Sequence, residues 1–519
     1  MSNSQNQLLT VNRSSAWSRS GLFQFFALTV LLSSVAFADV RLPALFSDHM
    51  VLQRGRAVPI WGWADDGEEI TVRIDRGSRG VWKTTAKDGR FMVLIQPQQI
   101  NRSMEVTLTG KNTVTLHDVV MGEVWICSGQ SNMQWTVEGS HEPKADIAAS
   151  ENSDLRLFYV PRVKADEPQS DVEAEWKLSQ PDTVRGFSSV AYYFGLHLQK
   201  NLNVPVGLIH TSWGGSPAEV WVDRPTLQSN PNYKTDLLDA SDKRMVDYEK
   251  RLAEWEKEKK EAEEQEKEFK KRRPGKGWVP SELYNGMIHP LIPYAIQGAI
   301  WYQGESNASR AYQYRSLFPD MIRNWRSNWG QGDFTFLEVQ LAPWREAEAE
   351  PGESDWAELR EAQLLATQIL PNVGMAVITD LGEEKDIHPR LKKPVGDRLG
   401  LAARGIAYQE KVVHSGPLYK SCSLDGGEAV IEFDHVGKGL DIRGSKLIGF
   451  SIAGQDRKFK WADAEIISKH MIKVSSPDVK QPIAVRYGWA DYPLVNLFNK
   501  EGLPASPFRT DSFPLTTGP

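Results

Sequence analysis

Cysteine is scarce in this chain, whose 519 residues include only Cys127 and Cys422. Two such distant cysteines do not form a disulfide framework, and no Cys/His cluster has the spacing of a metal site. We therefore expect neither a metal nor another cofactor. The chain also has no excess of basic residues, as its net charge of −6 shows. This charge argues against a nucleic-acid partner.

A hydrophobic run long enough to span a bilayer comfortably is missing at the start of the chain, where Gly21–Val30 is too short. This run follows Arg13 and Arg19 and precedes Ala36-Phe37-Ala38, which together are typical of a secretory signal peptide. We therefore predict that residues 1–38 are a signal peptide and that the mature protein is secreted or periplasmic, with no membrane attachment after cleavage. A retained N-terminal anchor is the alternative.

The composition, 40% apolar and 25% charged, is typical of a globular protein, and the length predicts about three domains. Residues 39–121 contain short strand patterns separated by turns such as Asp65-Asp66-Gly67 and Asp88-Gly89. This pattern predicts an N-terminal antiparallel β-sandwich. Strand patterns return after about residue 409, so we predict a C-terminal β-rich domain at residues 410–519.

Strand and helix patterns alternate between residues 122 and 409, which predicts a parallel sheet with helices on both faces. The helical patterns cover residues 188–202, 311–329, 357–370 and 391–408. An insertion at about residues 234–282 interrupts this order. Within it, Tyr248–Arg273 is dominated by Glu, Lys and Arg, and opposite charges three and four residues apart predict an exposed helix.

Four apolar strands of this α/β region end in polar or glycine residues. Ligands bind at the carboxyl edge of open α/β sheets, so these segments predict a site there. The segments are Ser128-Gly129-Gln130-Ser131-Asn132-Met133, Trp213-Gly214-Gly215-Ser216, Gln303-Gly304-Glu305-Ser306-Asn307 and Asp386-Ile387-His388-Pro389.

Ser131 follows a strand at a point where a helix can begin, beside N–H groups that suit an oxyanion. A turn or an N-cap is the ordinary alternative for such a serine. A serine hydroxyl attacks an ester only when a base takes its proton. Among the histidines, His388 follows a strand and stands beside the carboxylate of Asp386, so it suits that role. We interpret three other histidines of the α/β region, His197, His210 and His289, as structural.

The motifs GQSNM, WGGSPAE, YQGESN and DIHP, in this order, resemble the sialate O-acetylesterase branch of the SGNH-type serine esterases. The resemblance covers most of the chain after about residue 40. It implies an SGNH-type three-layer α/β hydrolase flanked by N- and C-terminal β-sandwich domains. It also implies Ser131 as nucleophile and His388 as general base, with an oxyanion hole formed by the N–H groups of Ser131 and Gly215 and the side chain of Gln303.

The acid of the triad departs from the family pattern. SGNH enzymes usually space this acid and the histidine as D-x-x-H, whereas here Asp386 and His388 enclose only Ile387. We predict Asp386 as the third member of the triad. Asp380, Glu384 or a backbone carbonyl are the alternatives.

The resemblance implies an acetylated carbohydrate as the substrate and an acetyl-serine intermediate. Glu305 and Trp213 are candidate substrate-binding residues. For Glu305 the alternatives are support of Gln303 and a buried ion pair, and for Trp213 the alternative is a place in the core. A different hypothesis is a non-catalytic carbohydrate-binding protein on a decayed esterase scaffold. The joint presence of the predicted nucleophile, base and oxyanion residues argues against decay. The sequence leaves open which sugar is acetylated and which oligomeric state forms.

Overall fold

The structure, a computed structural model, describes residues 39–75, 80–97 and 101–518. The predicted signal peptide lies outside these described residues. In the described part of the chain, no helix combines the length and the apolar character needed to cross a bilayer.

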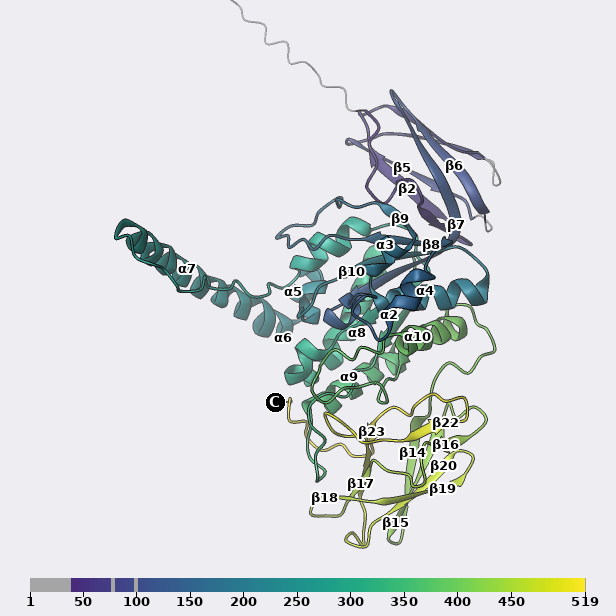
Figure 1. The fold of residues 1–519 in the computed structure, drawn as a ribbon, viewed down its shortest axis with the longest axis vertical. Coiled ribbons are helices and arrows are strands. Elements are labelled where there is room, and N and C mark those ends of the chain that lie inside the picture. Colours follow the sequence, from purple (N-terminus) through teal and green to yellow (C-terminus); the bar gives the residue numbers. More distant parts are fainter. Residues whose placement is uncertain (1–38, 76–79, 98–100, 519) are drawn as a thin grey trace, which may run out of the picture. The chain divides into compact units, whose positions relative to one another are not determined.

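A mostly parallel sheet forms the centre of the α/β region (Figure 1). Its neighbouring strands pair in parallel, except that β8 and β9 are antiparallel. The strand order is β13 (Val373–Ala376), β12 (Thr335–Val339), β11 (Gly298–Tyr302), β7 (Thr113–Gly129), β10 (Val206–Ser212), β8 (Asn152–Tyr159) and β9 (Trp176–Ser179).

Both faces of this sheet are buried. In β11, Ala299 and Trp301 belong to one apolar core, whereas the intervening Ile300 and the following Tyr302 belong to another. The first core includes residues of α8 (Ala311–Trp329) and α9 (Asp355–Ile369), and the second includes residues of α4 (Ser189–Leu202) and α10 (Lys393–Ile406). The sheet is therefore the middle of three layers. Long apolar strands without polar alternation are expected for a parallel sheet that helices cover on both sides.

The four predicted helices are confirmed, each with ends within two residues of the predicted ranges. Ser188 caps α4 by accepting a hydrogen bond from the N–H of Ala191, and Ser354 caps α9 in the same way from Ala357. The helices are α1 (Ser131–Gln134), α2 (Pro143–Ala148), α3 (Pro181–Arg185), α4 (Ser189–Leu202), α5 (Arg224–Ser229), α6 (Pro231–Tyr233), α7 (Ala240–Glu264), α8 (Ala311–Trp329), α9 (Asp355–Ile369) and α10 (Lys393–Ile406).

Strand β7 belongs to two regions of the fold. Its first half pairs with β6, and residues from Glu123 onward pair with β10 and β11. The predicted division between residues 121 and 122 thus falls inside a continuous strand. The remaining N-terminal strands are β1 (Val51–Gln53), β2 (Val58–Trp63), β3 (Glu69–Asp75), β4 (Gly80–Thr85), β5 (Arg90–Ile95) and β6 (Asn101–Thr109).

The C-terminal region is rich in antiparallel strands, as the sequence predicted. Its strands form three sheets around a core that includes Ile431, Phe450 and Tyr487. They are β14 (Leu418–Asp425), β15 (Glu428–Asp434), β16 (Leu440–Ile442), β17 (Phe450–Ala453), β18 (Phe459–Trp461), β19 (Asp463–Ser468), β20 (Met471–Ser475), β21 (Ala484–Tyr487), β22 (Leu497–Asn499) and β23 (Phe508–Arg509).

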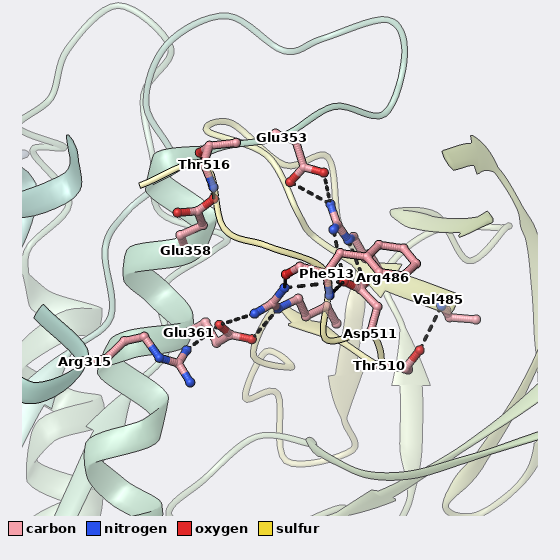
Figure 2. Close-up of polar contacts among 11 residues, drawn as sticks. Arg315, Glu353, Glu358, Glu361, Val485, Arg486, Thr510, Asp511, Phe513 and Thr516 are labelled. Carbon is pink, nitrogen blue, oxygen red and sulfur yellow. Dashed lines mark hydrogen bonds and ion pairs between the residues drawn. The ribbon is translucent and has the colours of Figure 1, made fainter. Parts of the chain in front are cut away.

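Ion pairs and hydrogen bonds join this C-terminal region to α9 and the loop before it (Figure 2). Arg509 contacts Glu361 of α9 at 2.8 Å, and buried Arg486 contacts Glu353 at 2.9 Å. The backbone N–H of Thr516 donates to Glu358 of α9 at 2.6 Å. The β-rich region and the α/β region therefore share a polar interface.

The charged insertion forms α7, which confirms an exposed helix but not its predicted range, since the helix begins at Ala240 and residues 265–273 are not helical. Ser241 is the one buried residue of this helix. Pairs of opposite charge four residues apart, such as Lys257 with Glu261 and Lys259 with Glu263, line its surface. In Figure 1, α7 lies apart from the helices that cover the sheet.

Candidate active site

The end of β7 places Ser131 at the first residue of α1. The turn between them needs glycine at position 129, where φ is +140° and a β-carbon would collide with the carbonyl oxygen of Tyr302. Because the first N–H groups of a helix have no partner within it, the N–H of Ser131 is free of helical hydrogen bonding. The short helix thus presents both a hydroxyl and an N–H at the edge of the sheet.

His388 lies beside this hydroxyl. Its Nε2 is 2.8 Å from Ser131 Oγ, and its ring stacks on Trp135 with ring centroids 5.2 Å apart and planes 18° apart. Burial and the nearby ammonium of Lys392 lower the pKa of His388, although Asp386 acts in the opposite direction. A lowered pKa keeps the imidazole neutral at neutral pH, which is the form that accepts a proton.

Asp386 is the predicted acid that the structure brings to His388. Its Oδ1 lies 3.5 Å from Nδ1 of the imidazole and accepts a closer hydrogen bond, at 2.9 Å, from the backbone N–H of His388. The alternative acid Asp380 is engaged by Arg398, which donates to both of its oxygens at 2.6 and 2.8 Å. The short spacing therefore produces a loop in which Asp386 contacts the histidine mainly through the backbone.

The loop after β10 lies against α1. The N–H of Gly214 donates to Gln134 Oε1 at 2.7 Å, and a β-carbon on Gly214 would stand 3.3 Å from Ser131 Cβ. The next residue, Gly215, is exposed and has φ +75°, a conformation that glycine adopts without strain. The structure thus brings Gly214, the residue directly before Gly215, close to Ser131.

Gln303, the third predicted oxyanion donor, makes hydrogen bonds within the fold. Its side chain is fully buried, and its Nε2 donates to Asn307 Oδ1 at 2.7 Å and to the carbonyl of Ser216 at 3.3 Å. Its Oε1 accepts from the hydroxyl of Tyr314 at 3.0 Å. Both N–H groups of the amide are therefore engaged, so donation to an oxyanion requires exchange of one of these bonds. As it stands, the amide supports the loop that carries Gly215.

Glu305 lies in a buried polar cluster that the sequence did not predict. Its Oε1 accepts a 2.5 Å hydrogen bond from Asn132 Nδ2, and Asn132 Oδ1 accepts one of 2.5 Å from Lys392 Nζ. Burial raises the pKa of Glu305 and lowers that of Lys392 to about 7. The position of Asn132 in the motif, directly after Ser131, is the one sequence signal that could have indicated this cluster.

Trp213 is partly exposed and forms an edge-to-face pair with Trp278 of the insertion, with ring centroids 5.5 Å apart. The ammonium of Lys164 lies 4.0 Å from the Trp278 ring centroid. By contrast, Trp221, Trp301 and Tyr302 are fully buried, so these aromatic side chains belong to the core.

The three other histidines that the sequence singled out in the α/β region are engaged elsewhere. His197 pairs with Asp397, and His289 donates to the carbonyl of Gln169. His210 is buried beside Ser212, and burial lowers its pKa to about 3. Their structural interpretation agrees with these contacts.

A cleft of about 810 Å³ lies between the loop that contains Gly215 and the charged insertion. Gly215 and Ser306 line one part of it, and side chains of the insertion line another. Tryptophan and arginine side chains are among the lining groups, including Trp278, Arg244, Arg251 and Arg310. Residues of the exposed helix α7 thus form a wall of this cleft, a position that its charge pattern alone did not indicate.

A serine and a histidine in hydrogen-bond contact at the carboxyl edge of a three-layer α/β fold are the arrangement of a serine esterase. The model of the family "carbohydrate esterase, sialic acid-specific acetylesterase" matches residues 267–400. This matched range includes Gln303, Glu305, Asp386 and His388.

Relatives match almost the whole chain. The sialate O-acetylesterase of Mus musculus is 30% identical, with 92% of this chain and 95% of that protein covered. The Homo sapiens protein of the same name is 28% identical, with 90% and 92% covered. The crystal structure of a carbohydrate acetylesterase from Xanthomonas citri is 37% identical with a TM-score of 0.79, and covers 92% of this chain and 100% of that one. The chain belongs to the sialate O-acetylesterase family of carbohydrate esterases.

Proposed function

We propose that this esterase removes O-acetyl groups from a carbohydrate through an acetyl-Ser131 intermediate. The observation that carries the proposal is the 2.8 Å contact between Ser131 Oγ and His388 Nε2. Because Nε2 accepts from the hydroxyl, the imidazole proton is on Nδ1, the nitrogen that faces Asp386. The histidine is thus the base, and Asp386 orients it and stabilises the imidazolium.

The reaction has two acyl-transfer steps. Ser131 Oγ attacks the acetyl carbonyl carbon while its proton moves to His388, and the sugar hydroxyl then leaves with that proton. A water molecule, deprotonated by the same histidine, next attacks the acetyl-serine, and the histidine returns the proton to Ser131 Oγ as acetate is released. The N–H groups of Ser131 and Gly215 stabilise the oxyanion in both steps. Gln303 either joins them after exchanging a hydrogen bond or keeps the Gly215 loop in place.

The sugar that carries the acetyl group occupies the cleft between Gly215 and the insertion. Tryptophan faces stack on sugar rings and arginine side chains donate to hydroxyl or carboxylate oxygens, so Trp278 and its arginine neighbours suit such a ligand. The signal pattern at residues 1–38 supports action outside the cytoplasm. The non-catalytic alternative is not favoured, because the similar proteins are esterases by name over nearly their full length.

A substrate panel tests the proposal. Acetate release is measured from an aryl acetate, from O-acetylated sialic acid and from neutral acetylated oligosaccharides, with intact-mass analysis of quenched protein. We expect turnover of at least one acetylated carbohydrate and a protein mass increased by one acetyl group, located on Ser131. Turnover without any acetylated protein under rapid quench, together with activity in Ser131→Ala, contradicts the acetyl-serine mechanism.

Trp278→Ala tests the role of the cleft. We expect kcat/KM for the preferred acetylated carbohydrate to fall about tenfold, mainly through KM, because one stacking face is lost. The rate with a small aryl acetate should stay near that of the wild type. Trp255→Ala is the matched control, since this tryptophan packs on Phe269 of the same insertion and does not line the cleft. An equal loss in kcat/KM with the carbohydrate and with the aryl acetate would instead indicate that Trp278 stabilises the fold.

A further inference from the structure

Lys392 is a buried lysine four residues beyond His388, directly before α10. Its exposed fraction is 1%, and its Nζ lies 5.2 Å from the ring centroid of Tyr302. A buried ammonium is costly unless other groups compensate its charge. Here the compensation comes from Asn132 Oδ1, at 2.5 Å, and from the carboxylate of Glu305 on the other side of the same amide.

Asn132 connects this lysine to the catalytic residues. Its Nδ2 donates to Glu305 Oε1 at 2.5 Å and to the carbonyl of Ile387 at 3.0 Å, while its Oδ1 accepts from Lys392. An ammonium can only donate and a carbonyl can only accept, so the orientation of the amide is determined by its partners. Asn132 follows Ser131, and Ile387 precedes His388. One side chain therefore joins the nucleophile's helix to the loop that carries the base.

We propose that Lys392 is a positioning residue, which acts through Asn132 to hold His388 against Ser131. The inference rests on the proposed acetyl-serine mechanism and adds to it the control of the base. Fold stability alone does not require this buried polar cluster, because an apolar cluster of the same volume would fill the space without a desolvation cost. A function in catalysis explains why the cluster is polar.

The charges around the imidazole give the direction of the effect. Asp386 on the same loop favours the protonated imidazole, whereas burial and Lys392 disfavour it, and the pKa of His388 is lowered as a result. Ser131 and Trp135, which also contact the ring, carry no charge. Lys392 itself faces the carboxylates of Glu305, Asp386 and Glu383, which partly offset the effect of burial on its own pKa. Removal of the ammonium should therefore raise the pKa of His388.

Three substitutions separate the charge of Lys392 from its hydrogen bond. Lys392→Arg keeps both, Lys392→Gln keeps a donor without the charge, and Lys392→Met removes both. The measurement is kcat/KM for an aryl acetate as a function of pH, because its acidic limb reports the base of the free enzyme. The wild-type limb should lie below the ordinary histidine pKa of 6.5.

We expect the limb to move to higher pH in both neutral variants, by roughly half a unit or more, and to stay in place in Lys392→Arg. Lys392→Met should also lose about 10- to 100-fold in kcat with little change in KM, because the base is no longer held in position. The loss in kcat should be smaller for Lys392→Gln than for Lys392→Met. Titration of the His388 ring by NMR gives the same shift without relying on activity, and circular dichroism checks the fold of each variant.

An acidic limb at the wild-type position in both Lys392→Gln and Lys392→Met would overturn the inference. Such a result together with an inactive Ser131→Ala would leave the acetyl-serine mechanism intact. Conversely, an active Ser131→Ala would contradict that mechanism, whatever the pH profiles show. If Lys392→Met does not fold, Lys392→Gln still decides the matter, because it retains a hydrogen bond to Asn132.

Discussion

Ser131→Ala is expected to fold normally and to lose esterase activity by about 10⁴- to 10⁶-fold in kcat. The substitution removes the attacking oxygen but leaves the backbone N–H of α1, the loop of Gly215 and the stack of Trp135 on His388 unchanged. The residual rate then reflects oxyanion stabilisation and binding alone. Acetate release from an aryl acetate, with thermal unfolding as a check of the fold, measures the effect.

Ser229→Ala is the matched control for this substitution, because its hydroxyl donates to a local carbonyl in the short helix α5. It should keep the wild-type rate. An active Ser131→Ala protein, purified free of contaminating esterase, would remove Ser131 from the mechanism and leave the contact with His388 as a structural hydrogen bond.

His388→Ala should cause a loss of comparable size, about 10⁴-fold or more, since the serine hydroxyl then has no general base. The imidazole is half-buried between Trp135 and Ser131, so its removal leaves a space that free imidazole can enter. Partial recovery of activity with added imidazole would distinguish a missing base from a damaged fold. A His289→Gln protein, altered at a histidine that bonds Gln169, should keep near-normal activity. Full activity in His388→Ala would contradict the assignment.

Asp386→Asn should lower kcat by roughly 10- to 100-fold, which is less than the loss expected for Ser131→Ala or His388→Ala. Where the triad acid is tightly bonded to the histidine, its replacement by asparagine lowers kcat by about 10⁴-fold, because the asparagine amide stabilises the wrong imidazole tautomer. Here the carboxylate is 44% exposed, lies 3.5 Å from Nδ1 and is closer to the backbone N–H of His388. A loss near 10⁴-fold, with the fold intact, would show that Asp386 acts as a full triad acid and that its contact with Nδ1 shortens when substrate binds.

The sequence predicted where Ser131 and His388 lie because local patterns in the chain, the apolar strands before each residue, determine their positions. The strands before Ser131 and His388 are continuous apolar runs, and parallel pairing brings the carboxyl ends of such strands to one edge. The first residues of α4 and α9 were also predictable to within two positions, because a serine that caps the N-terminus precedes each helix.

Long-range packing determines what the sequence did not reveal. A lysine in a polar loop is ordinarily exposed, so nothing near Lys392 indicated that it is buried against Asn132 and Tyr302. The engagement of Gln303 by Asn307, Ser216 and Tyr314 likewise depends on segments up to 87 residues away in the chain. Periodicity indicated that α7 is exposed, but it carried no information about the cleft beside it.

The continuity of β7 limits how this enzyme can be divided or recombined. Its first half supplies hydrogen bonds to β6 and β1, while its last residues supply those of β10 and β11 and lead to Ser131. A cut at residue 121 would therefore sever a strand and leave unpaired edges on two sheets, which invites aggregation. Chimeras that exchange the N-terminal module should be joined in the loops on either side of β7, so that the entire strand comes from a single parent.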